Sequence, residues 1–110
     1  MAKLERTLTG DFDALLDYLH DGILSGSASA SWEDGSDYSG PDFRCAVRVY
    51  ERYSLLGGNR VSLTLTLVGE GNRIFISAIT SGGSQAVFFK INTWGEEAFL
   101  DTLLDVLQHL

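Results

Sequence analysis

The two histidines are the first residues to consider for acid–base or metal chemistry. His20 is flanked by Asp17 and Asp21, and His109 lies near the other end of the chain. A metal centre needs three or four ligands that converge in space. One histidine with two neighbouring carboxylates is short of that set. We therefore predict no metal site and expect both histidines to be solvated at helix ends.

The single cysteine, Cys45, is the candidate thiol nucleophile. A reactive cysteine is exposed, has a lowered pKa and lies near a base. Cys45 instead alternates in phase with Phe43 and Val47, which predicts a side chain packed in the core. No pair of His, Cys, Ser or carboxylate residues has the spacing of acid–base or nucleophilic catalysis. We predict neither catalytic residues nor a cofactor.

Two polar segments have the composition of known ion- or phosphate-binding loops but lack the spacing of their ligand residues. Residues 33–42 hold four acids but lack the alternating ligands and terminal Glu of a calcium-binding loop. Ser81-Gly-Gly-Ser84 lacks the Lys-Ser/Thr that follows the glycines of a phosphate-binding loop. We interpret the first segment as a solvated loop and the second as a turn between strands.

Three arginines form the strongest candidate interaction surface. Arg44, Arg48 and Arg52 recur every four residues, so they share one face of a strand over roughly 26 Å. We predict that they join Thr64 and Thr66 on an exposed polar sheet face that contacts an acidic partner or a second copy. The alternative is a solvated face on which arginine stems cover apolar surface.

Aromatic residues form the candidate ligand pocket. We predict an apolar pocket between the sheet and the last helix, lined by Trp32, Phe75, Trp94 and Phe99. The alternative is that these side chains are ordinary core residues.

Helical periodicity occurs twice. The first stripe consists of Phe12, Leu15, Leu16, Leu19 and Ile23. Thr93 and Glu96 match a capping box and predict the start of a long C-terminal helix, whose stripe is Phe99, Leu103, Val106, Leu107 and Leu110.

The segment from Val61 to Val68 defines the sheet, because apolar and hydroxyl residues alternate along it. A two-residue turn at residues 70–71 would pair Leu67 with Ile74. Before Val61, we predict a three-residue turn or a bulge near Tyr50, since either keeps the arginines out of the core.

Further strands are expected at residues 3–9, 28–32, 43–54 and 85–91. The resulting order, β-α-β-β-β-β-β-α, predicts one α+β domain over residues 1–110. Its antiparallel sheet would carry the N-terminal helix and the long C-terminal helix on one face.

Charge and composition narrow the list of partners. The net charge of −7 argues against general nucleic-acid binding. Residues 42–73 hold five arginines and three acids, whereas the rest of the chain holds three basic and twelve acidic residues. No stretch approaches the ~20 apolar residues of a membrane span, and a single cysteine fits a reducing compartment. We expect a cytoplasmic protein that contacts neither nucleic acid nor membrane.

Five segments carry a likeness to a known family: residues 10–13, 33–38, 45–54, 78–85 and 88–96, the last reading Phe88-Phe-Lys-Ile-Asn-Thr-Trp-Gly-Glu96. They resemble a family of small bacterial proteins classed as a domain of unknown function. The resemblance implies a bacterial, single-domain protein and no site residues. The element order also resembles a shortened helix-grip fold of the START and Bet v 1 kind, in which a curved sheet wraps a long C-terminal helix.

The sequence thus leaves three function classes open. We favour a module that binds a small apolar ligand in the aromatic pocket. A homo-oligomeric or protein-interaction domain that uses the Ser/Thr/Arg sheet face is the alternative. An enzyme is disfavoured, because no catalytic spacing is present.

Overall fold

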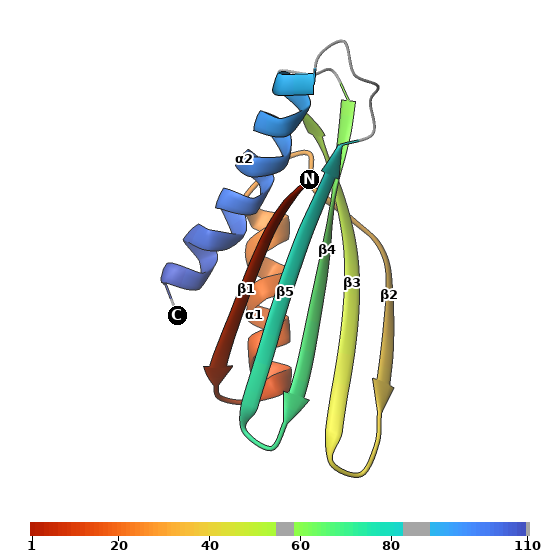
Figure 1. Cartoon of the computed structure of the whole chain (residues 1–110), viewed down its shortest axis with the longest axis vertical. Coiled ribbons are helices and arrows are strands. Elements are labelled where there is room, and N and C mark those ends of the chain that lie inside the picture. Colours follow the sequence, from red (N-terminus) through yellow and green to blue (C-terminus); the bar gives the residue numbers. More distant parts are fainter. Residues whose placement is uncertain (55–58, 83–88, 110) are drawn as a thin grey trace.

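The computed structural model describes residues 1–54, 59–82 and 89–109. The elements are β1 (Ala2–Thr9), α1 (Phe12–Ser25), β2 (Ser31–Ser39), β3 (Phe43–Ser54), β4 (Asn59–Glu70), β5 (Arg73–Gly82) and α2 (Phe89–Gln108). The strands form one antiparallel sheet in the order β1-β5-β4-β3-β2, and both helices lie on the same side of it (Figure 1). The predicted α+β class is confirmed.

The core lies between the sheet and the two helices. Val61, Leu63, Leu65 and Leu67 of β4 are fully buried, as the alternation predicts, while Ser62, Thr64 and Thr66 between them are half-buried on the opposite face. The predicted stripe of α1 is also confirmed, since all five of its members are at most 9% exposed. Phe99, Leu100 and Leu103 of α2 complete the core. The sheet therefore packs on two helices and does not wrap the C-terminal helix alone.

The β4–β5 hairpin has a different register from the predicted one. Its two-residue turn is Gly71-Asn72, so Glu70 pairs with Arg73 and Leu67 pairs with Ile76, not with Ile74. Gly71 has φ +62°, a conformation that glycine adopts without steric cost. The shift is two residues, and two is the side-chain period of a strand, so the same side chains still face the core.

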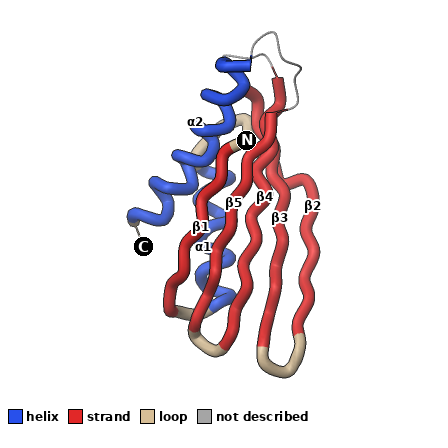
Figure 2. Tube along the Cα trace, viewed as in Figure 1, coloured by secondary structure: helices blue, strands red, loops and turns tan. Residues whose placement is uncertain are grey.

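The expectations for residues 28–42 are wrong over residues 28–30 and 33–39. The strand predicted at 28–32 and the loop predicted at 33–42 are replaced by β2, which pairs with β3 along the edge of the sheet (Figure 2). A register shift between Trp32 and Asp34 interrupts the side-chain alternation. This polar edge strand is held by main-chain hydrogen bonds to β3 and not by burial of apolar side chains. Its sequence therefore lacks the hydrophobic alternation from which a strand is predicted.

The start predicted for the last helix is also wrong. Helix α2 begins at Phe89, so Thr93 and Glu96 lie inside it and do not cap its first turn. In the strand predicted at 85–91, residues 85–88 lie outside the described residues and residues 89–91 are helical. A short run of apolar residues is compatible with a strand or with a helix, and residues 89–91 form part of a helix.

The two helices approach each other closely at small residues. A Cβ atom at Gly22 of α1 would lie 2.6 Å from both methyl groups of Val106, and one at Gly26 would clash with the methyl group of Thr102. Tyr18 Oη donates a hydrogen bond of 3.0 Å to the carbonyl of Val106. The glycines therefore set the spacing at which both helices reach the same sheet face.

Candidate functional site

The arginine row lies on the helix-covered face of the sheet, which contradicts the predicted exposed face. Arg52 pairs with Val61 and Arg48 with Leu65, and the register of β3 against β4 is continuous, with no bulge near Tyr50. The turn predicted before Val61 falls at residues 55–58, outside the described residues. The arginines are tolerated there because each guanidinium finds a partner near the margin of the core.

The three guanidinium groups have different partners, and that of Arg48 lies 3.0 Å from Asp37. Arg44 lies 2.8 Å from Asp13 and 4.4 Å from the centre of the Phe12 ring. Its hydrogen bond lowers the pKa of Asp13. Arg52 stacks 4.8 Å from the Phe99 ring and donates to Thr102 Oγ1 at 3.4 Å. Burial lowers the pKa of Arg52, although guanidinium remains charged at neutral pH.

Cys45 lies on the opposite, uncovered face, so the prediction that it packs in the core is wrong. It is half-buried and sits beside Val68 of β4 and Tyr38 of β2. The phase with Phe43 and Val47 was correct, but the side assigned to it was not. Ala46 and Tyr50 occupy the core side of β3.

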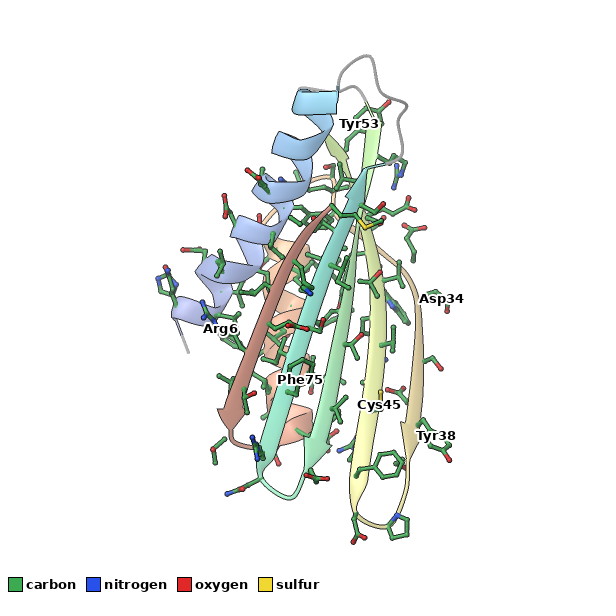
Figure 3. The ribbon with its side chains drawn as sticks, viewed as in Figure 1. Arg6, Asp34, Tyr38, Cys45, Tyr53 and Phe75 are labelled. Atoms are coloured by element: carbon green, nitrogen blue, oxygen red, sulfur yellow. The ribbon has the colours of Figure 1, made fainter. Side chains whose placement is uncertain are left out.

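The uncovered face, called the outer sheet face below, has no charged side chain at the centre of its three middle strands. Those positions are Phe75, Ser77 and Ile79 of β5, Thr64, Thr66 and Val68 of β4, and Cys45, Val47 and Val49 of β3. Val68, Phe75 and Ile79 are 36–39% exposed. Phe75 marks this face on β5, and Cys45 and Tyr38 mark it on the neighbouring strands β3 and β2 (Figure 3). No described helix or loop covers it.

The structure separates the residues that were expected to share a site. Phe99 is fully buried in the core, whereas Phe75 lies on the outer sheet face. Trp32 lies on the edge strand β2 and is 55% exposed, and the side chain of Trp94 is outside the described residues. Thr64 and Thr66 do lie on an uncovered face, but on the side opposite to the arginines.

A cleft between α1 and the β2–β3 edge brings together polar residues that the sequence did not group. It has a volume of about 410 Å³ and is lined by Leu16, Asp17, His20, Trp32, Gly35, Asp37 and Arg48. His20 is half-buried, not solvated as expected, and its Nδ1 lies 2.7 Å from the Tyr50 phenolic oxygen. Burial raises the pKa of Tyr50 to about 12, so this phenol keeps its proton at neutral pH.

One signal for this cleft was present in the sequence. Asp17 and His20 are three residues apart and therefore neighbours on one helix face. The partners from β2 were missed because residues 33–42 were interpreted as a loop.

A second cavity, more apolar in its lining, lies between β1 and α1. Its volume is about 420 Å³, and its lining residues are Leu8, Thr9, Gly10, Asp11, Ala14, Leu15, Tyr18 and His109. His109 itself is exposed, as expected, and its Nδ1 donates to the carbonyl of Asp105 at 2.7 Å. Within the described ranges, no three His, Cys, Asp or Glu side chains gather as a metal site.

A comparison with models of known protein families shows the family of this chain. A model described as a family of unknown function, DUF6054, matches residues 1–110. The chain belongs to the DUF6054 family. No curated protein matches this DUF6054 domain. None of its described helices is long and apolar enough to cross a membrane. The family assignment agrees with the resemblance seen in the sequence. The description of the family names no activity.

Proposed function

We propose that this DUF6054 domain is a self-associating module in which two copies pack through their outer sheet faces. The observation that carries the proposal is the uncharged centre of that face, where Val68, Phe75 and Ile79 stay more than a third exposed. Interface cores are depleted in charged residues and enriched in aromatic ones, with the polar groups at the rim.

The size of the face supports a stable pair. Five strands of about ten residues each, at ~4.8 Å between strands and ~3.3 Å per residue, cover roughly 800 Å². A standard specific interface buries about 800 Å² on each partner. Face-to-face packing of two such sheets therefore reaches the usual size without any other contact.

Charge favours the outer sheet face over the helices as the contact between two copies. The exposed side of α1 carries Asp13, Asp17 and Asp21, and that of α2 carries Glu97, Asp101 and Asp105. Two copies approaching through their helices would repel each other, since like charges placed together are unfavourable. The outer sheet face has no such cluster, and its charges lie near the rim, where Glu51 pairs with Arg60 at 2.7 Å.

The sheet edges are poor alternatives for association. Strand β1 presents Lys3, Glu5 and Arg6, and strand β2 presents Glu33 and Asp34 next to its irregular register. Charged residues and bulges are the features that keep edge strands from pairing with other chains. The face is therefore favoured over the edges.

The test is the molecular mass in solution, measured by size-exclusion chromatography with light scattering over a range of concentrations. The natural chain is expected to elute at twice its mass of 12.0 kDa. Phe75→Lys places a charge in the contact and is expected to weaken the dimer by about 100-fold or more, because two unpaired charges would be buried.

Phe75→Leu is the matched control, since it keeps the site apolar and is expected to leave the dimer intact. Both variants keep the fold, because Phe75 is 38% exposed in the single chain. A natural chain that stays at 12.0 kDa at every concentration and salt level contradicts the proposal.

A second candidate function is the binding of a small apolar ligand, and the cavity between β1 and α1 favours it. Its volume of about 420 Å³ lies within the range of small-molecule sites, ~300–1,000 Å³. Leu8, Ala14 and Leu15 supply its apolar surface. The proposed ligand site is therefore distinct from the pocket expected beside Trp94 and Phe99.

Fluorescence of the neutral probe N-phenyl-1-naphthylamine tests this candidate. Ala14→Phe fills the cavity from an exposed position and is expected to abolish the probe signal, since no room is left. Ala98→Phe, at an exposed position of α2 outside the cavity lining, is the control and is expected to retain it. Equal signals from both variants would rule this cavity out.

A further inference from the structure

The cleft between α1 and the β2–β3 edge contains an exposed aromatic wall and an uncompensated negative charge. Trp32 lines it with 55% of its surface accessible, and Asp17 lines it from α1. Among the described residues, Asp17 has no ion-pair or hydrogen-bond partner. The cleft lies on the helix side of the sheet, so it is separate from the outer sheet face. It shares no described lining residue with the cavity between β1 and α1.

The positive group in the cleft is already satisfied. Arg48 is only 17% exposed and lies 3.0 Å from Asp37, and it also donates to the carbonyl of Val47 at 2.9 Å. A second donation runs to the carbonyl of Ser36 at 3.4 Å. With its guanidinium engaged by a carboxylate and two carbonyls, Arg48 has little capacity left to hold an anion. The remaining charge in the cleft is the carboxylate of Asp17.

The indole ring of Trp32 and the imidazole ring of His20 are held in place by contacts within the protein. Trp32 Nε1 donates to the carbonyl of Asp34 at 2.8 Å, which fixes the indole on the edge strand. His20 packs against it at a ring-centre distance of 5.8 Å and an angle of 83°. On its other side, His20 is fixed by Tyr50, whose side chain is fully buried. The walls of the cleft are therefore preorganised, which reduces the entropy cost of binding.

We propose that this cleft binds a small organic cation, a protonated amine or a quaternary ammonium group. Indole faces attract such cations through the electrostatic potential of the ring, and a nearby carboxylate adds a Coulombic attraction. The volume of about 410 Å³ accommodates a ligand of this class. The net charge of −7 raises the local concentration of cations around the chain.

Choline is the probe for the test, and its neutral carbon isostere, 3,3-dimethyl-1-butanol, is the control ligand. Both are titrated into the full chain and followed by ¹H–¹⁵N correlation spectra, at an ionic strength matched with sodium chloride. Choline is expected to shift the Trp32 indole and Gly35 amide signals in a saturable manner. The isostere has the same shape without the charge, and it is expected to bind at least about tenfold more weakly.

Two variants and one control variant test the residues. Trp32→Leu and Asp17→Asn are each expected to weaken choline binding by about tenfold or less, in line with the strength of single cation–π and exposed charge contacts. Asp101→Asn removes the same charge from an exposed position on α2 and is expected to leave the affinity unchanged.

Three results would overturn the proposal. The first is equal binding of choline and its isostere, which would show that the positive charge is not recognised. The second is saturable shifts with inorganic phosphate at Trp32 and Gly35, which would make Arg48 an anion site. The third is an equal loss of affinity in Asp17→Asn and Asp101→Asn, which would reduce the effect to overall charge. Because the isostere comparison uses the natural chain, it does not depend on how the variants fold.

Discussion

Replacing Leu65 with alanine is expected to lower the free energy of unfolding by about 2–5 kcal/mol. Leu65 is fully buried in the central strand β4, between Arg48 of β3 and Ala78 of β5. The side chains around it are held by a continuous sheet, so they close the resulting cavity only in part. Urea unfolding followed by circular dichroism measures the change.

Thr64→Ala is the matched control in the same strand. Its side chain lies on the outer sheet face, so the substitution is expected to cost at most about 1 kcal/mol, the span of strand propensities. The two variants are compared at one protein concentration, because self-association raises apparent stability by mass action. Similar losses at the two positions would mean that the helix-covered face has been assigned to the wrong side.

The second large effect is expected at the helix crossing. Gly22→Ala is expected to destabilise the domain by about 1–3 kcal/mol through overpacking, reduced by the ~1 kcal/mol that alanine gains over glycine in a helix. The new methyl group would meet both methyl groups of Val106 at 2.6 Å. Valine is branched at Cβ and has one strongly preferred rotamer in a helix, so the Val106 side chain cannot rotate to relieve the clash. Thermal unfolding of the purified variant measures the loss.

A double mutant separates this clash from a general effect of the substitution. Val106→Ala combined with Gly22→Ala should be more stable than the sum of the single losses predicts, because the smaller side chain makes room for the methyl group. Gly10→Ala is the neutral control, since a Cβ atom there has nothing within 4 Å. Strict additivity of Gly22→Ala and Val106→Ala would contradict the proposed contact.

Periodicity predicted the elements of the core well. The α1 stripe, the bounds of β3 and the buried side of β4 follow from it, because a strand or helix that packs on one face must repeat its apolar residues at the element's own period. Alternation gives the phase of a strand but not the side that is covered. In β3, one side carries Phe43, Cys45 and Val47, and the other carries Arg44, Ala46 and Arg48.

The apolar side of β3 faces outward and the arginine side faces the helices, which reverses the expected order. The arginines fit there because their stems are apolar and their guanidinium groups find Asp13, Asp37 and the Phe99 ring. Those partners come from three other elements, so the sequence of β3 alone could not indicate them. The cleft beside His20 escaped prediction for the same reason, since it depends on a polar edge strand held by main-chain hydrogen bonds.

The pairing of β1 with β5 has a consequence for how the chain folds during synthesis. Strands β2 to β5 follow one another as hairpins, whereas the bond from Thr80 Oγ1 to the carbonyl of Ala2 spans 78 residues. Contacts between distant residues form late, since the loop they close costs entropy that no earlier contact offsets. Strand β1 is therefore synthesised well before its partner β5, and until β5 pairs with it the charged side chains of β1 hinder pairing with other nascent chains.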